Sequence, residues 1–366
     1  MMKHYRLGEI CNIVSGGTPS RSNTSFWEGG TIPWIKIGNI SQKYVNTADE
    51  YITQEGLDGS SAKMLPSGTI LYTIFATLGE VGILSIDACT NQAIAGLTIR
   101  NPEQVRTDYI YYYLKSRKVY VSNLGRGVAQ NNINMSILRD FDVPLPSIEQ
   151  QDEIITVLEK TSAVIEGRKE ELGKLDDLIK ARFVELFGDP LINPKGFPVR
   201  TIDEVSVLNK GITYSPEDVA DEGIIVLRSS NIQGNTFDLN DLVKITKKVS
   251  PDKYVQENDI LMCNRNGSAR LVGKVAKIPK LNEDMTFGTF MTIVRSDIHE
   301  YLFAFFQMDA FREQIKFQTA VAINQISLPL LASVKVPIPP IELIEEFTAF
   351  TEQVDKSKVV EISEVA

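Results

Sequence analysis

The chain has 366 residues, 43% of them hydrophobic, which is enough for two or three globular domains and excludes a largely disordered protein. Its three cysteines and two histidines are too few and too scattered for a disulfide framework, a zinc knuckle or a Ser-His-Asp triad. The net charge of −9 argues against a uniformly basic nucleic-acid-binding protein, but the acidic excess falls mainly in two predicted helices and leaves two near-neutral segments.

The first predicted unit covers residues 1–146 and is mainly β. Alternating apolar and β-branched residues favour strands, with Gly, Pro, Ser and Asn in the turns between them. A helix is expected around Tyr111–Leu114. The expected strands include Leu7–Ile10, Trp34–Ile40, Gly68–Leu71 and Gly96–Arg100.

A long helix is predicted over residues 147–190. Its apolar residues recur every seven positions, and Gly188–Pro190 ends the pattern. About 40 residues at about 1.5 Å each form a rod of about 60 Å, which is too long to be stable without packing along a partner. The repeating positions are Leu158, Ile165, Leu172, Ile179 and Leu186.

The second predicted unit, residues 197–340, repeats the first at an offset of about 193 residues. Val143–Glu149 (VPLPSIE) returns as Val336–Glu342 (VPIPPIE), and Val128–Ile133 returns as Val321–Ile326. Both pairs share one register, which a chance match would not. Further equivalent pairs are Leu7–Ile10 and Ile202–Val205, Trp34–Ile40 and Val226–Ile232, Gly68–Leu71 and Asn258–Leu261, and Gly96–Arg100 and Met291–Arg295.

A second, shorter helix is predicted over residues 341–366. Because each helix leaves its own unit toward the other, we expect the two to pair antiparallel, with Ile341 near Phe187. The stretch Ile148–Leu158 then lacks a full intramolecular partner. Its apolar side chains could belong to an ordinary bundle core or could bind a partner protein, and both interpretations stay open. The candidates for partner binding are Ile148, Ile155 and Leu158.

The predicted fold class is α+β: two mainly β domains with accessory helices, separated by two long antiparallel helices in a pseudo-two-fold internal repeat. The start of the sequence has no apolar signal region, and no stretch has the roughly 18 apolar residues of a membrane helix, so we expect a soluble cytoplasmic protein. No phosphate-binding glycine motif and no metal-ligand cluster is evident. We therefore expect no cofactor, no metal and no catalysis by this chain alone.

Several loops have the composition of nucleic-acid contacts. Arginine can read guanine, and asparagine or glutamine can read adenine, through paired hydrogen bonds, while lysine and serine position phosphates. The same residue types are common in ordinary turns, and aromatic residues such as Tyr214, Phe287 and Phe290 could serve the core instead of packing on bases. The candidate DNA contacts are Arg21, Lys36, Arg126, Gln130, Asn131, Arg228, Asn231, Asn264, Arg265 and Arg270.

Four motifs together resemble the specificity subunit of type I restriction-modification systems. The resemblance covers essentially the whole chain, and the last motif combined with the long helix is its most specific part. The motifs are Ser15–Ser20 (SGGTPS), Ile32–Ile40 (IPWIKIGNI), Leu65–Leu71 (LPSGTIL) and Pro144–Ile154 (PLPSIEQQDEI).

The resemblance implies two target-recognition domains at 1–146 and 197–340, each binding one half of a split double-stranded DNA sequence. It implies that the helices at 147–190 and 341–366 set the spacing and dock methyltransferase subunits, which carry S-adenosylmethionine and the methylation chemistry. A further restriction and translocase subunit would cleave DNA. The chain departs from the family in its short second helix and in Leu208–Tyr214, which lacks the GGTP form.

We expect a non-catalytic DNA-recognition subunit that binds a bipartite target. The main alternative is a coiled-coil scaffold or adaptor whose β units bind proteins, because it would share every structural feature above. A steep fall of DNA affinity with increasing salt concentration would favour the DNA-recognition subunit. A DNA affinity that does not change with salt would favour the adaptor.

Overall fold

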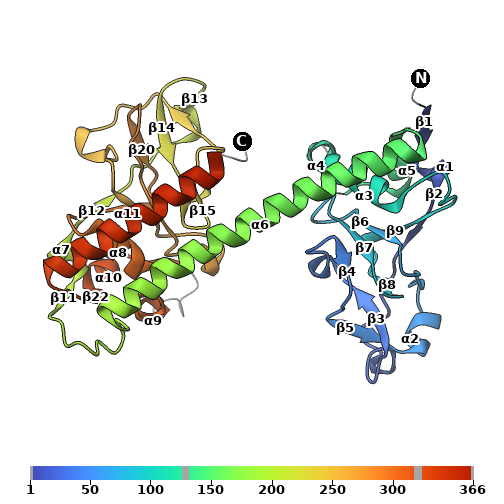
Figure 1. Ribbon diagram of the computed structural model, residues 1–366, viewed down its shortest axis with the longest axis horizontal. Coiled ribbons are helices and arrows are strands. Elements are labelled where there is room, and N and C mark those ends of the chain that lie inside the picture. The colour runs from blue at the N-terminus through green and yellow to red at the C-terminus, as the bar shows by residue number, and fades with distance from the viewer. Residues whose placement is uncertain (1–2, 126–131, 317–323, 364–366) are drawn as a thin grey trace. The chain divides into compact units, whose positions relative to one another are not determined.

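The computed structural model describes residues 3–125, 132–316 and 324–363, and the chain forms two compact units, Met1–Glu166 and Gly167–Ala366. Each unit combines small sheets with short helices (Figure 1). The predicted α+β class and internal repeat are confirmed. One helix, α6 (Ile148–Phe187), contributes its first half to one unit and its second half to the other.

The first unit is built on a five-stranded sheet with order β2-β9-β6-β7-β4 and a three-stranded sheet with order β5-β3-β8. A third, two-stranded sheet pairs β1 (Lys3–Arg6) with β10 (Asp142–Leu145). The strands of the larger sheets are β2 (Cys11–Ser15), β3 (Ile32–Ile35), β4 (Tyr44–Val45), β5 (Glu50–Ile52), β6 (Ile70–Thr73), β7 (Val81–Leu84), β8 (Cys89–Thr90) and β9 (Ile94–Ile99). The helices are α1 (Leu7–Ile10), α2 (Gln54–Asp58), α3 (Thr107–Ser116), α4 (Lys118–Gly125) and α5 (Met135–Arg139).

The second unit repeats this plan with two four-stranded sheets, β12-β21-β18-β19 and β13-β17-β14-β20, and the pairs β11-β22 and β15-β16. The strands are β11 (Val199–Thr201), β12 (Val207–Lys210), β13 (Val219–Ala220), β14 (Ile224–Leu227), β15 (Ile232–Gln233), β16 (Thr236–Phe237), β17 (Lys244–Ile245), β18 (Ile260–Cys263), β19 (Val275–Lys277), β20 (Met285–Phe287), β21 (Met291–Arg295) and β22 (Lys335–Pro337). The helices are α7 (Ile202–Val205), α8 (His299–Phe306), α9 (Asp309–Lys316), α10 (Leu328–Ser333) and α11 (Ile341–Ser363).

The backbone reproduces the repeat in detail. Strand β3 pairs in parallel with β8, and β14 pairs in parallel with β20, so that Ile35 and Leu227 occupy equivalent positions. In both units a 3₁₀ turn follows, and its last asparagine accepts a hydrogen bond from the amide of Lys36 or Arg228. The sequence register of Trp34–Ile40 with Val226–Ile232 is therefore confirmed.

Two predicted strands are wrong. Leu7–Ile10 and Ile202–Val205 each form one turn of helix, α1 and α7. In each case a glutamate at the third helical position, Glu9 or Glu204, accepts a hydrogen bond from the backbone amide just before the helix. This capping satisfies an N–H that a strand would have paired with a neighbour, and it outweighs the apolar alternation.

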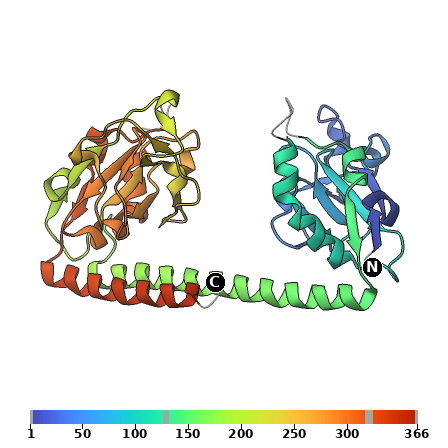
Figure 2. The same ribbon diagram turned by 90° about the horizontal axis from the view of Figure 1, so that it is seen from above.

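The second long helix packs antiparallel on the second half of α6 (Figure 2). Arg182 forms an ion pair with Glu346, and Asp176 forms one with Lys358, so that residue numbers rise along one helix as they fall along the other. Phe183 and Phe347 meet between them with ring centroids 5.6 Å apart. The predicted antiparallel pair is confirmed within this unit.

Candidate nucleic-acid interface

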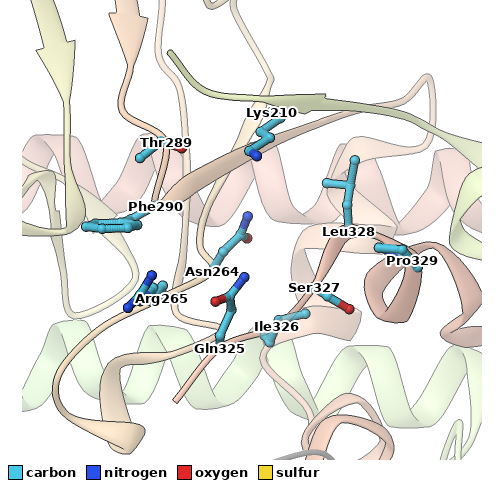
Figure 3. A pocket seen from close by; sticks show the side chains of 10 residues that line it. All are labelled: Lys210, Asn264, Arg265, Thr289, Phe290, Gln325, Ile326, Ser327, Leu328 and Pro329. Atoms are coloured by element: carbon cyan, nitrogen blue, oxygen red, sulfur yellow. The ribbon is translucent and has the colours of Figure 1, made fainter. Parts of the chain in front are cut away.

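The second unit contains a pocket of about 320 Å³ where four separate segments meet (Figure 3). Lys210 ends β12, Asn264 and Arg265 follow β18, and Phe290 precedes β21. Lys210, Asn264 and Gln325 point toward the same space, and Arg265 lies beside Phe290. Two of the ten lining residues are cations and none is a carboxylate. The remaining lining residues are Thr289, Ile326, Ser327, Leu328 and Pro329.

Backbone hydrogen bonds hold this pocket in shape. The Asn264 amide donates to the Phe290 carbonyl oxygen at 2.8 Å, and the Ile326 amide donates to the Asn264 carbonyl oxygen at 2.8 Å. An antiparallel bridge joins Arg265 to Gln325. The pocket is thus defined by main-chain pairing, which leaves its side chains free to vary.

Arg265 is exposed, and its guanidinium lies 5.1 Å from the centre of the Phe290 ring. Phe290 is itself 51% exposed, unlike Phe287, which belongs to the core. Stacking on an exposed ring holds a cation in place without engaging it in an ion pair with a carboxylate. Arg265 can therefore offer its guanidinium donors to an outside ligand.

Asn264 is buried with one free acceptor. Its side chain is 7% exposed, and its Nδ2 donates to Thr292 Oγ1. Its Oδ1 has no hydrogen-bond partner within the described residues. A buried acceptor left without a donor costs about 1–3 kcal/mol, so this oxygen favours a ligand that brings one.

The first unit has the same frame around different side chains. The Ile74 amide donates to the Ala93 carbonyl oxygen, the Ile133 amide donates to the Ile74 carbonyl oxygen, and a bridge joins Phe75 to Asn132. Phe75, which is 41% exposed, therefore occupies the position of Arg265.

Lys36 and Arg228 also occupy equivalent positions, and each is paired with a carboxylate. Lys36 lies 2.5 Å from Glu50, and Arg228 lies 2.8 Å from Asp241. Glu50 also pairs with Arg21, and the hydrogen bonds from Arg21 and Lys36 lower the pKa of its carboxyl group. These cations would have to exchange an existing ion pair for a DNA phosphate or base.

The prediction of a DNA contact is wrong for Asn231. Its side chain is completely buried, its Oδ1 accepts from the Arg228 amide, and its Nδ2 donates to the carbonyl oxygens of Asp238 and Asp241. All its hydrogen-bonding atoms serve the local turn. The sequence resemblance between Asn231 and Asn39 marked a structural residue that caps a turn in both units.

The other predicted contacts differ in their surroundings. Arg21 stacks 3.7 Å from the centre of the Trp27 ring, and Arg270 is exposed. Arg126, Gln130 and Asn131 lie outside the described residues.

Sequence reasoning missed Lys210 and Gln325 as contributors to a site, and for Phe290 it weighed packing on bases against a role in the core. Gln325 lies in the repeated string Val321–Ile326 and is the equivalent of Asn132 in the first copy. The repeat could therefore have indicated Gln325. Lys210 carried no such signal, because only the pairing of β12 with β21 brings it near Asn264.

The three predicted partner-binding residues on α6, Ile148, Ile155 and Leu158, are half-buried. Ile155 packs against the core of the first unit. The expectation that this stretch lacks an intramolecular partner is therefore wrong for Ile155, because its side of the helix faces its own unit. The exposed apolar side chains lie one position away, at Ile154 and Val157.

No described helix has the length and apolar character needed to cross a membrane. The described residues also contain no group of three or more His, Cys, Asp or Glu side chains placed to bind a metal ion.

Comparison with known proteins identifies the family. The model of the type I restriction modification DNA specificity domain matches residues 1–174 and 194–362. The type I restriction enzyme MjaIX specificity subunit of Methanocaldococcus jannaschii is 27% identical over 226 residues, which cover 56% of this chain and 52% of that protein. The EcoR124I/EcoR124II specificity subunit of Escherichia coli is 29% identical over 176 residues, covering 45% and 43%.

Among solved structures, the S subunit of a type I restriction-modification system from M. genitalium aligns with a TM-score of 0.49 and 16% identity, over 100% of this chain and 92% of that one. The chain spans about half the length of the two curated relatives. Because the family model matches both halves of the sequence, the chain belongs to the type I restriction modification DNA specificity family.

Proposed function

We propose that this chain is the sequence-specific DNA-recognition subunit of a type I restriction-modification complex. Each unit reads one half of a bipartite double-stranded target, and the helices dock the methyltransferase subunits. Methylation and cleavage reside in the partner subunits. The family match and the names of the relatives, which are specificity subunits, support this assignment.

The observation that carries the proposal is the pocket formed by Lys210, Asn264, Arg265, Phe290 and Gln325. It combines cations, amide groups and an exposed ring, and its lining has no carboxylate to repel a phosphate. Phosphate contacts supply affinity without regard to sequence, whereas side-chain contacts to base edges supply discrimination.

The individual groups suit different parts of DNA. The Arg265 guanidinium has the fork geometry that reads the O6 and N7 atoms of guanine. The Asn264 Oδ1 can accept from the exocyclic amine of adenine or cytosine, because its own Nδ2 is engaged by Thr292. Lys210 carries the point charge suited to a phosphate.

Arg265→Ala tests the proposal. Methylome sequencing of cells that carry the whole system gives the target, and DNA affinity is then measured with either half of the target scrambled. We expect the DNA affinity of Arg265→Ala to fall about tenfold or more, or about 1–3 kcal/mol, on one of these two DNAs. This is the DNA that keeps the half-site read by Arg265; affinity for the other DNA should stay the same. Arg200→Ala is the matched control, since Arg200 is an exposed arginine of the same unit that pairs with Glu204.

Equal loss on scrambled DNA would reduce Arg265 to a phosphate contact. The affinity of the unmodified chain should also fall steeply with salt, because bound phosphates release counterions. Affinity that stays flat with salt would instead support the protein-binding adaptor. DNA methylation or cleavage by the purified chain alone would contradict the assignment of catalysis to partners.

A further inference from the structure

The pocket of the second unit (Figure 3) has a counterpart in the first unit, and main-chain hydrogen bonds identify its residues one by one. The Gly16 amide donates to β9 at 3.0 Å, and the Gly211 amide donates to β21 at 3.4 Å, so the residues just before these glycines are equivalent. The frame of hydrogen bonds described above matches the remaining positions. The equivalent pairs are Ser15 and Lys210, Ile74 and Asn264, Phe75 and Arg265, and Ala93 and Phe290.

These four positions are mainly polar in the second unit and mainly apolar in the first. The second unit has two cations, Lys210 and Arg265, and the buried acceptor of Asn264. In the first unit Ile74 is 3% exposed and belongs to the core, so it offers no acceptor where Asn264 has one. Residues 69–79 contain no Asp, Glu, Lys, Arg or His. This loop of the first unit therefore cannot read a base through a charged side chain.

Phe75 is the residue that the loop exposes. Its side chain is 41% exposed, whereas Ile74 before it and Leu78 three positions later are buried in the core of the first unit. The side chains of Ala76 and Thr77 are exposed as well but are small. Phe75 therefore supplies most of the apolar surface that this loop can offer to a ligand.

The turn that carries Phe75 is fixed by its own hydrogen bonds. The Thr73 hydroxyl donates to the Thr77 carbonyl oxygen and accepts from the Glu80 amide at 2.8 Å. Within this turn Ala76 adopts a φ of 60°, a left-handed conformation that disfavours any residue with a Cβ. The closed turn holds Phe75 at a set place, so little conformational freedom is lost when a ligand meets it.

An exposed aromatic side chain suits an apolar feature of DNA. The major groove presents one such feature on its base edges, the 5-methyl group of thymine, whereas the other groups there donate or accept hydrogen bonds. Phe75 occupies the backbone position that Arg265 occupies in the second unit, so both side chains meet their half-sites at the same depth. This equivalence favours contact with a base edge over insertion between stacked base pairs.

We infer that Phe75 determines specificity in the first unit's half-site by contacting the 5-methyl group of a thymine. The two units then use one backbone frame to select different features at equivalent places, an apolar feature in the first unit and a polar one in the second. The inference rests on the proposed function, because it names the base feature that one unit reads.

Replacement of thymine by uracil is the test, because uracil lacks only the 5-methyl group. Methylome sequencing gives the target, and duplexes are made in which each thymine in turn is replaced by uracil. Fluorescence anisotropy measures the affinity of the full chain for each duplex. We expect one thymine whose replacement lowers the affinity about fourfold, which corresponds to the burial of about one methyl group.

Variants of the chain assign this loss to Phe75. Phe75→Ala should bind the thymine and uracil duplexes equally, and Phe75→Leu, which keeps an apolar side chain, should keep most of the difference between them. Arg265→Ala is the control, because it should leave the ratio of the two affinities unchanged. Circular dichroism and thermal melts show whether each variant is folded, as we expect for changes at exposed positions.

Three outcomes would overturn the inference. The first is specific binding in which no thymine can be distinguished from uracil. The second is a thymine that stays equally sensitive to replacement in Phe75→Ala, because Phe75 would then insert between base pairs or serve the fold alone. The third is a sensitive thymine in the half-site that Arg265→Ala affects, because both residues would then read the same half-site. Failure to distinguish the target from scrambled DNA would instead contradict the proposed function.

Discussion

The two units share a backbone frame and differ in the side chains that the frame presents. At one position the second unit places Arg265 on Phe290 beside an open pocket, whereas the first unit places Phe75. The hydrogen bonds that fix this position join main-chain atoms in both units. Because main-chain pairing tolerates any side chain that fits, the frame can be kept while the surface changes.

The same contrast holds along the long helices. Phe347 is buried under the end of α6, and the equivalent Ile154 is partly exposed. Equivalent positions in a repeat therefore do not have equivalent environments. The difference depends on which other segment packs on each position, and the first of the following four predictions tests this.

The largest difference is expected at this helix position. Phe347→Ala should lower the free energy of unfolding by about 3–5 kcal/mol, because it leaves a cavity among Phe183, Phe187 and Tyr301. Ile154→Ala should cost only about 1 kcal/mol, since its side chain is already partly in water. Urea unfolding monitored by circular dichroism measures both. Similar losses for the two variants would mean that Ile154 is covered.

The next largest difference in stability is expected at the residue just before β18 in the second unit and just before β6 in the first. Asp259 is 1% exposed and makes two hydrogen bonds of 2.7 Å with Arg295, whose pKa is raised by this contact. Asp259→Asn should destabilise the second unit by about 3 kcal/mol, because Arg295 loses its countercharge. The equivalent Thr69 bonds to the Pro66 carbonyl oxygen, so Thr69→Ala should cost about 1 kcal/mol. Thermal unfolding compares them, and a larger loss at Thr69 would contradict the comparison.

A smaller effect is expected one residue earlier. Gly68 and Asn258 both have a positive φ, of 86° and 68°. Gly68→Ala should cost about 1–2 kcal/mol from backbone strain alone, because a Cβ at this position meets no atom within 4 Å. Gly68→Asn should cost less, as the second unit already uses Asn258 there. If the alanine variant were as stable as the asparagine variant, strain would not be the cause.

The smallest expected effect is the absence of a reaction at the cysteines. Burial raises the pKa of the Cys11 and Cys89 thiols to about 12 and raises that of Cys263. Raised values keep the thiols protonated at pH 8, and only the thiolate reacts with iodoacetamide. Mass spectrometry should therefore find native protein unmodified and all three cysteines alkylated in denaturant. Rapid native alkylation of any one would show that its unit opens.

The repeat was visible in the sequence because it resides in residues that shape the backbone. The prolines before each long helix and the pair Asn39 and Asn231 keep the same roles in both units. The one-turn helices α1 and α7 were missed, since their capping by Glu9 and Glu204 competes with an apolar pattern that also suits a strand.

The candidate site was predictable only in part. Arg265 and Asn264 were found from loop composition, but Lys210 joins them through strand pairing between segments far apart in the chain. The amide of Asn231 is chemically suited to a base contact, but the side chain is buried and cannot reach a base. Composition indicates which atoms are available, whereas exposure decides which of them a ligand can reach.

The sequence by itself determined the repeat and the two long helices with their bounds near Phe187 and Ile341, because these depend on local pattern and spacing. Only the tertiary structure decided which face of α6 is buried. Ile155 was predicted to bind a partner, but it packs on its own unit, whereas Ile154 and Val157 are exposed. A helical period defines the faces of a helix, but which face meets a core depends on the contacts made by the rest of the fold.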